Sequence, residues 1–149
     1  MTACEILKKH FSASEQAYRI VLEHSRLVAD KALVIASSSR LPVDLTFIEE
    51  AALLHDIGIV GVNSPRLDCH GQEPYIRHGI IGRKILESEG LPRHAMVCER
   101  HIGVGLTPED ISEQGLPLPL RHMTPVSDEE KIICLADLFY SKRPEEMTR

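Results

Sequence analysis

Residues 51–58 (AALLHDIG) place two metal-competent side chains directly after four apolar residues. The apolar residues predict the last turns of a buried helix, and Gly58 stands where a helix often ends in the left-handed backbone conformation. A buried carboxylate is strongly unfavourable without a partner, and a divalent cation is one such partner. The plainer interpretation is an exposed Asp56 and a hydrogen-bonded His55 at a helix end, so the rest of the chain must decide.

The composition is that of one globular helical domain. The chain has 149 residues, of which 43% are hydrophobic, 26% charged and only 4% aromatic. We expect a single domain over residues 1–149, with a core at about 13–140 and a polar tail at 142–149. The net charge of −5 argues against generic nucleic-acid binding, because there is no basic excess to neutralise phosphates.

The cysteines and the N-terminal residues indicate a cytoplasmic location without membrane contact. The four cysteines are widely spaced and form no C-x-x-C pair, which argues against a zinc ribbon or a disulfide framework. The N-terminus lacks a basic start followed by an apolar run, and no apolar stretch reaches membrane-spanning length.

Apolar spacings of three and four residues predict an all-α bundle of about six to seven helices. Asp44 or Thr46 can cap the helix before the His-Asp pair, and Ser127 with Glu130 predicts a capping box. We expect no strand, a connecting loop at 60–72, and a Pro-rich segment at 116–126 that wraps over the bundle. The approximate helix ranges are 5–11, 14–36, 44–56, 73–89, 93–101, 107–115 and 127–140.

Six His and Asp side chains recur on apolar helix faces or at helix ends. Each alone is more often a satisfied core residue, but five helices that offer ligands toward one core are what a metal site in a bundle requires. Imidazoles with carboxylates suit Fe, Mn, Zn or Ni, and six ligands favour two ions with a bridging carboxylate. The six are His24, His55, Asp56, His78, His101 and Asp137.

The order H…HD…H…H…D of these residues resembles the binuclear members of the HD-domain superfamily of metal-dependent phosphohydrolases. Ile57 and Gly58 continue the His-Asp pair as in the HDIG subgroup. Three further stretches resemble a small, largely uncharacterised prokaryotic HDIG family: YIRHG at 75–79, HIGVGLT at 101–107 and EEKII at 129–133. The resemblance covers about residues 13–140.

The resemblance implies an enzyme that hydrolyses a phosphoester or phosphoanhydride bond in a small phosphorylated metabolite or nucleotide by metal-activated water. One or two divalent ions are implied, with Fe, Mn, Zn, Ni or Co as candidates and Mg as a further one, and a homodimer is a candidate assembly. Asp56, the implied catalytic residue, would bridge an ion on His24, His55 and Asp137 and an ion on His78 and His101.

Four basic residues near the implied ligands are candidates for binding substrate phosphate. The plainer interpretation of each is a solvated surface charge. They are Arg77, Arg83, Lys84 and Arg100. Two further histidines, His70 and His122, lie in loop-like sequence and could also join the site.

Two departures from the family keep other functions open. Many HD hydrolases carry a lysine where this chain has Ile59, and the signature that follows the histidine in cyclic di-GMP phosphodiesterases is absent after His101. The cyclic dinucleotide is therefore a poor substrate candidate. The alternatives are an HD-type di-iron oxygenase and a catalytically silent, metal-bound ligand-sensing domain.

Overall fold

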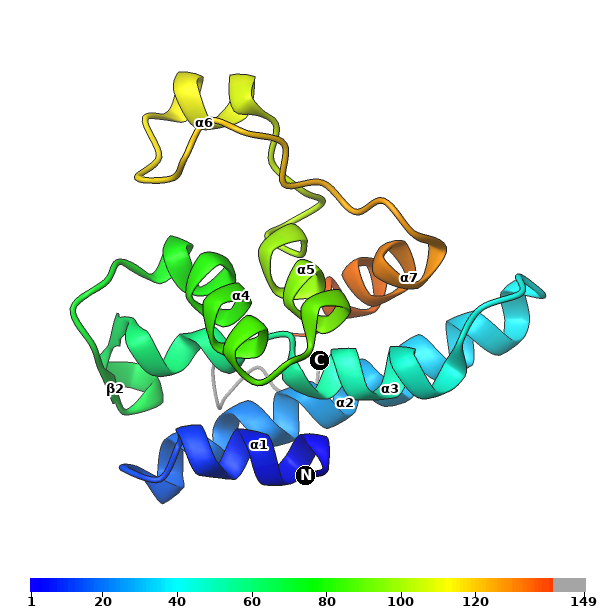
Figure 1. Ribbon diagram of the computed structural model, residues 1–149, viewed down its shortest axis with the longest axis horizontal. Helices are drawn as coiled ribbons and strands as arrows, with labels where there is room; N and C mark the ends of the chain where they lie inside the picture. Colours follow the sequence, from blue (N-terminus) through cyan, green and yellow to red (C-terminus); the bar gives the residue numbers. More distant parts are fainter. Residues whose placement is uncertain (141–149) are drawn as a thin grey trace.

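The computed structural model describes residues 1–140, which form seven α-helices (Figure 1). The predicted all-α fold of six to seven helices is confirmed. The helices are α1 (Ala3–His10), α2 (Glu15–Ser39), α3 (Leu45–Leu54), α4 (His78–Ser88), α5 (Pro92–Arg100), α6 (Pro108–Gln114) and α7 (Asp128–Asp137). The shorter elements are the 3-10 turns η1 (Ile57–Gly61), η2 (Pro65–Leu67) and η3 (Tyr75–Arg77) and the strands β1 (Asn63–Ser64) and β2 (Cys69–His70).

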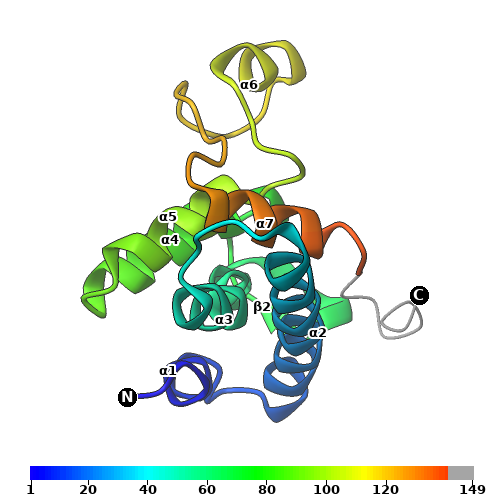
Figure 2. The same ribbon diagram turned by 90° about the vertical axis from the view of Figure 1, so that its right-hand side faces the viewer.

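The 25-residue helix α2 is the longest element and organises the others. It packs against α3 and α7, while α4 packs against α5 and against η1 (Figures 1 and 2). Helix α1 lies on the opposite side of α3 from α7 in Figure 2. Helix α6 stands apart from the rest of the bundle in both views.

Two apolar clusters fill the interior and meet along α2. Val21 of α2 and Leu54 of α3 belong to one cluster, and Val28 and Ala51 of the same helices belong to the other. Three- and four-residue spacings return to the same helix face, so His24 lies between Val21 and Val28 and is fully buried. A polar side chain therefore occupies the junction of two apolar clusters.

Side-chain caps define where α3 and α7 begin. Ser127 and Glu130 form the predicted capping box at α7. Of the two candidates for α3, Asp44 is the cap, since its carboxylate accepts a hydrogen bond from the Phe47 amide at 3.0 Å. Thr46 lies inside the helix.

Two helix boundaries differ from the sequence-based prediction. Helix α2 continues through Ser39 and ends at Arg40, whose φ is +61°, so the serines form the last helical turn and no loop. Helix α4 begins at His78 and not near residue 73, because Pro74 is extended and Tyr75–Arg77 form a 3-10 turn. Both errors arise because apolar spacing does not register a terminal turn that carries no buried residue.

The prediction that the chain has no strand is wrong in one small place. β1 and β2 pair antiparallel, with Asn63 opposite His70 and Ser64 opposite Cys69. Two residues per strand are too few to produce a readable alternation of apolar and polar side chains.

Residues 102–127, here called the arm, connect α5 to α7 and contain α6. The Pro-rich part is irregular, as predicted, but it returns beside α6 and does not wrap over the bundle (Figure 1). The arm has a small core of its own, in which Ile111 and Met123 pack with Ile80 of α4. Leu106 and Met123 also exchange backbone hydrogen bonds at 3.0 and 2.8 Å.

None of the helices within residues 1–140 combines the length and the apolar character that crossing a bilayer requires. The predicted polar tail at 142–149 lies outside the described residues.

Gly58 is required for close packing and not for a left-handed turn, which corrects the sequence-based expectation. Its φ is not among the positive values in residues 1–140. A Cβ atom at Gly58 would lie 1.8 Å from the His78 carbonyl oxygen and 2.5 Å from the Gly82 amide nitrogen. Only glycine lets η1 approach α4 this closely.

We therefore expect Gly58→Ala to destabilise the fold by at least about 3 kcal/mol, because both clashing groups are backbone and cannot rotate away. Gly61→Ala is the matched control in the same turn, since its Cβ would meet only the flexible Ile81 side chain, at 3.1 Å. We expect it to lower stability by about 1 kcal/mol or less. Chemical denaturation measures both changes, and equal losses would contradict this account.

Candidate metal centre

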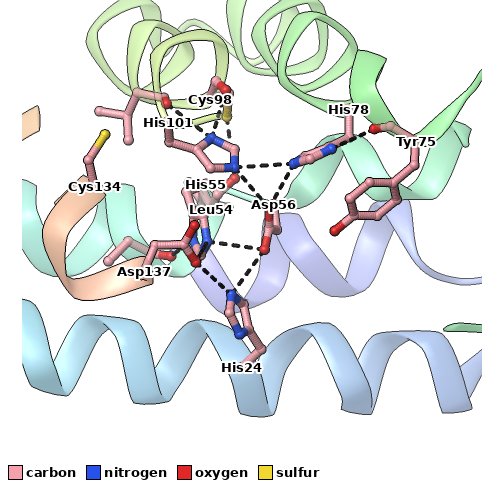
Figure 3. A network of polar contacts seen from close by, with 12 residues as sticks. His24, Leu54, His55, Asp56, Tyr75, His78, Cys98, His101, Cys134 and Asp137 are labelled. Carbon is pink, nitrogen blue, oxygen red and sulfur yellow. Dashed lines mark hydrogen bonds and ion pairs between the residues drawn. The ribbon is translucent and has the colours of Figure 1, made fainter. Parts of the chain in front are cut away.

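Five helices deliver six His and Asp side chains to one place, the His/Asp cluster (Figure 3). One comes from the middle of α2, two follow the end of α3, one begins α4, one follows α5 and one ends α7. These residues are, in that order, His24, His55 and Asp56, His78, His101 and Asp137. Asp137 is thus the last residue of α7, although the sequence suggests a position in the middle of the helix.

Four members form one group around two carboxylates. The Nε2 atom of His24 lies 2.9 Å from Asp137 Oδ1 and 3.2 Å from Asp56 Oδ2. The Nε2 atom of His55 lies 3.1 Å from Asp56 Oδ2 and 3.2 Å from Asp137 Oδ1. Their candidate ligand atoms all lie within 4.8 Å of one another.

The other carboxylate oxygen of Asp56 belongs to a second group. Asp56 Oδ1 lies 3.1 Å from His101 Nε2 and 3.3 Å from His78 Nε2, and the two Nε2 atoms are 3.2 Å apart. Asp56 is therefore shared, with one oxygen turned toward each group.

Backbone carbonyls fix the orientation of three of the four imidazole rings. The Nδ1 atom of His55 donates to the Ala52 carbonyl at 2.6 Å, and that of His78 donates to the Tyr75 carbonyl at 2.7 Å. The Nδ1 atom of His101 donates to the Cys98 carbonyl at 2.8 Å. A carbonyl can only accept, so each of these rings carries its proton on Nδ1 and, when neutral, a lone pair on Nε2.

The facing atoms of the second group all carry lone pairs. Two neutral imidazole nitrogens and a carboxylate oxygen converge at 3.1–3.3 Å, and none of the three supplies a proton to the others. Burial holds the pKa of His101 below its usual value, which keeps that ring neutral. Such an arrangement repels itself unless a cation lies among the atoms, so the donor set fits a divalent metal ion.

The first group shows the same need for positive charge. Burial alone lowers the pKa of His55, but the Asp56 and Asp137 carboxylates outweigh it and raise this pKa to about 10. Burial raises the pKa of Asp137, but His55 and His24 outweigh that effect and hold it far below the ordinary range. The protonated imidazole thus occupies the electrostatic position that suits a metal ion.

The packing of η1 on α4 sets the distance between the two groups. Because Gly58 and Gly82 have no side chains, these backbones approach until a Cβ at Gly82 would lie 3.3 Å from the Gly58 nitrogen. Asp56 stands two residues before Gly58 and reaches His78 at 3.3 Å. The glycine contact therefore fits one carboxylate between both groups.

The three candidate arginines for substrate phosphate each have protein partners. Arg77 donates to the Pro117 carbonyl at 2.6 Å and pairs with Glu73 at 3.0 Å. Arg83 pairs with buried Glu99 at 2.8 Å.

The remaining candidates are placed differently. Arg100 pairs with buried Glu130 at 2.9 Å, and Lys84 is exposed. His70 is an exposed ribbon residue that pairs with Asp68, and His122 is exposed on the arm. Within the described residues neither histidine belongs to the two groups.

Several residues that support the cluster are missing from the sequence-based assignment. Ile59, at the position of the family's lysine, is fully buried in an apolar cluster and brings no charge. Tyr75 supplies the carbonyl that holds His78. The Tyr75 signal is readable in hindsight, since a carbonyl three residues before a histidine can reach its Nδ1 in a helical turn.

A family model of the HD domain matches residues 21–141, most of the chain. The chain therefore belongs to the HD-domain family, and the predicted membership is confirmed. A solved structure, the HD domain of the phosphodiesterase PgpH of L. monocytogenes, has a similar fold with a TM-score of 0.58 and 17% sequence identity. The match covers 89% of this chain and 70% of that one, and at this identity it concerns the fold.

Archaeal relatives share more sequence. An uncharacterized protein of Methanocaldococcus jannaschii is 37% identical over 131 residues, which cover 84% of this chain and 70% of that protein. Two proteins named tRNA (cytidine(56)-2'-O)-methyltransferase are 33% identical over 125 residues in Picrophilus torridus and 31% over 122 residues in Thermoplasma volcanium. These matches cover 83% and 81% of this chain but 32% of each methyltransferase, so that name describes much longer proteins.

Divalent metal should stabilise the protein, because a bound ion relieves the repulsion among the buried lone pairs. At a free Mn²⁺ concentration of 100 times its Kd we expect a gain of about 2.7 kcal/mol, measured as a rise in Tm after chelated protein is reloaded. Asp56→Asn should abolish the rise, whereas His122→Ala, the exposed control, should keep it. An equal rise in Asp56→Asn would place the ion elsewhere.

Proposed function

We propose that this protein is a metal-dependent phosphohydrolase with a binuclear centre, acting on a small phosphorylated metabolite or nucleotide. The observation that carries the proposal is the shared carboxylate of Asp56, which turns one oxygen toward each group of ligand atoms. His24, His55, Asp56 and Asp137 would hold one ion, and Asp56, His78 and His101 the other.

Divalent ions bound there lower the pKa of a bound water toward about 7 and neutralise charge on phosphoryl oxygens. The chain contributes rigid orientation, since the rings of His55, His78 and His101 are held by backbone carbonyls. It also excludes bulk water, since five of the six side chains are at most 5% exposed and only Asp137 reaches 16%. We infer that substrate approaches from the Asp137 side.

Cysteine chemistry does not compete with a water nucleophile. Burial raises the pKa of Cys134 to about 12 and that of Cys98 higher still, with nearby carboxylates adding to the effect. Both thiols therefore stay protonated at neutral pH and are poor nucleophiles. The partnered arginines likewise indicate that charge neutralisation falls mainly to the metal ions.

We expect phosphatase or phosphodiesterase activity in a panel of nucleotides and sugar phosphates assayed with Mn²⁺, Co²⁺, Ni²⁺ or Fe²⁺. Asp56→Asn and His55→Ala should each lower kcat/KM at least about a thousandfold, because they remove ligands of the ion that activates water. His122→Ala should retain wild-type rates. Hydrolysis absent from every condition, together with oxygen consumption by the iron-loaded protein, would contradict the proposal.

Metal content tests the binuclear arrangement separately. We expect about two ions per wild-type chain by elemental analysis and about one in His78→Ala, since that variant leaves the four-residue group complete. Asp56→Asn should lose both ions because its carboxylate belongs to both groups. One ion in the wild type and one in His78→Ala would exclude a second ion held by His78.

A further inference from the structure

A tyrosine ring lies against one of the buried histidines at the edge of the His/Asp cluster. The ring centroids of Tyr75 and His78 are 4.6 Å apart, with their planes tilted by 46°. His78 is 4% exposed, whereas Tyr75 is 38% exposed. Figure 3 shows Tyr75 beyond His78, on the side of Asp56 away from Asp137. Solvent therefore reaches an aromatic surface directly beside the proposed metal centre.

Exposed aromatic rings are scarce in this chain, which has three Tyr, three Phe and no Trp. Phe11 and Phe47 are buried in the core. Phe139 is 49% exposed, but the Lys31 ammonium lies over its ring at 4.6 Å from the centroid. Leaving an aromatic surface in water forgoes burial free energy, so the exposure of Tyr75 beside a polar site is informative.

We propose that Tyr75 is a specificity-determining residue whose exposed ring stacks on the base of a nucleotide while the phosphate lies at the metal centre. This inference rests on the proposed function and narrows its substrate class. A nucleotide has its phosphate and base on one sugar ring, and Tyr75 contacts a ligand histidine, so both ends can be engaged at once. Stacking tolerates any base, because every base presents a π face.

The ring and the support of His78 are separable in Tyr75. His78 Nδ1 is held by the Tyr75 carbonyl at 2.7 Å, a backbone atom that side-chain substitution keeps. Tyr75→Phe keeps the aromatic face and Tyr75→Leu removes it. A stacking role predicts that phenylalanine rescues what leucine loses.

The test compares two substrates that carry the same phosphate, adenosine 5'-monophosphate and ribose 5-phosphate, with the Mn²⁺-loaded protein. We expect the wild type to prefer the nucleotide in kcat/KM. Tyr75→Leu should lower the ratio of the two kcat/KM values about tenfold, mainly through the KM of the nucleotide, as the loss of one base-aromatic contact predicts. Tyr75→Phe and the control Phe139→Leu should keep the wild-type ratio.

Three results would overturn the inference: no preference in the wild type, an equal loss for both substrates in Tyr75→Leu, or the same change of ratio in Phe139→Leu. If neither ester is hydrolysed, the proposed function has failed. Dissociation constants of the two compounds, measured by calorimetry, then decide the stacking role. About tenfold tighter binding of the nucleotide by the wild type but not by Tyr75→Leu supports stacking, and equal constants exclude it.

Discussion

The fold is organised around a convergence of lone pairs that the protein alone does not neutralise. Three imidazoles donate Nδ1–H to backbone carbonyls and turn Nε2 inward, where they meet the two carboxylates of the His/Asp cluster. Burial removes water from these atoms and strengthens their mutual repulsion. The raised pKa of His55 shows how strongly the cluster demands a positive charge at its centre. Helix ends from five elements are positioned to create this demand, and a divalent cation satisfies it.

Much of this arrangement is readable from the sequence, because polar residues on apolar helix faces are rare and must find partners. The spacing of His24 within the α2 stripe, and the position of Asp137 at the end of an apolar helix, point inward without knowledge of the fold. Distances are a different matter. The fit of Asp56 between two groups depends on backbone contact at Gly58, where the sequence indicates a glycine but not whether it serves a turn or a close approach.

Charged residues are the least predictable part of the site, because proximity in sequence does not reveal which carboxylate reaches which cation. Arg83 and Arg121 both pair with the buried carboxylate of Glu99, and Arg77 binds a carbonyl of the arm. Arg100 pairs with Glu130 where the arm joins α7. These contacts attach the arm to α4, α5 and α7. Guanidinium groups near a phosphate site can therefore serve the scaffold, and sequence position alone cannot separate the two roles.

The carbonyl anchors of the imidazole rings have a consequence for how such a centre is dissected. Alanine scanning deletes side chains and leaves peptide groups in place, so it would reveal no residue that orients His55, His78 or His101. The supports would become visible only through replacements in the main chain itself, such as an ester in place of an amide, or through shifts of whole helical turns. A centre built this way tolerates drift in its surrounding side chains while its ring geometry stays constant.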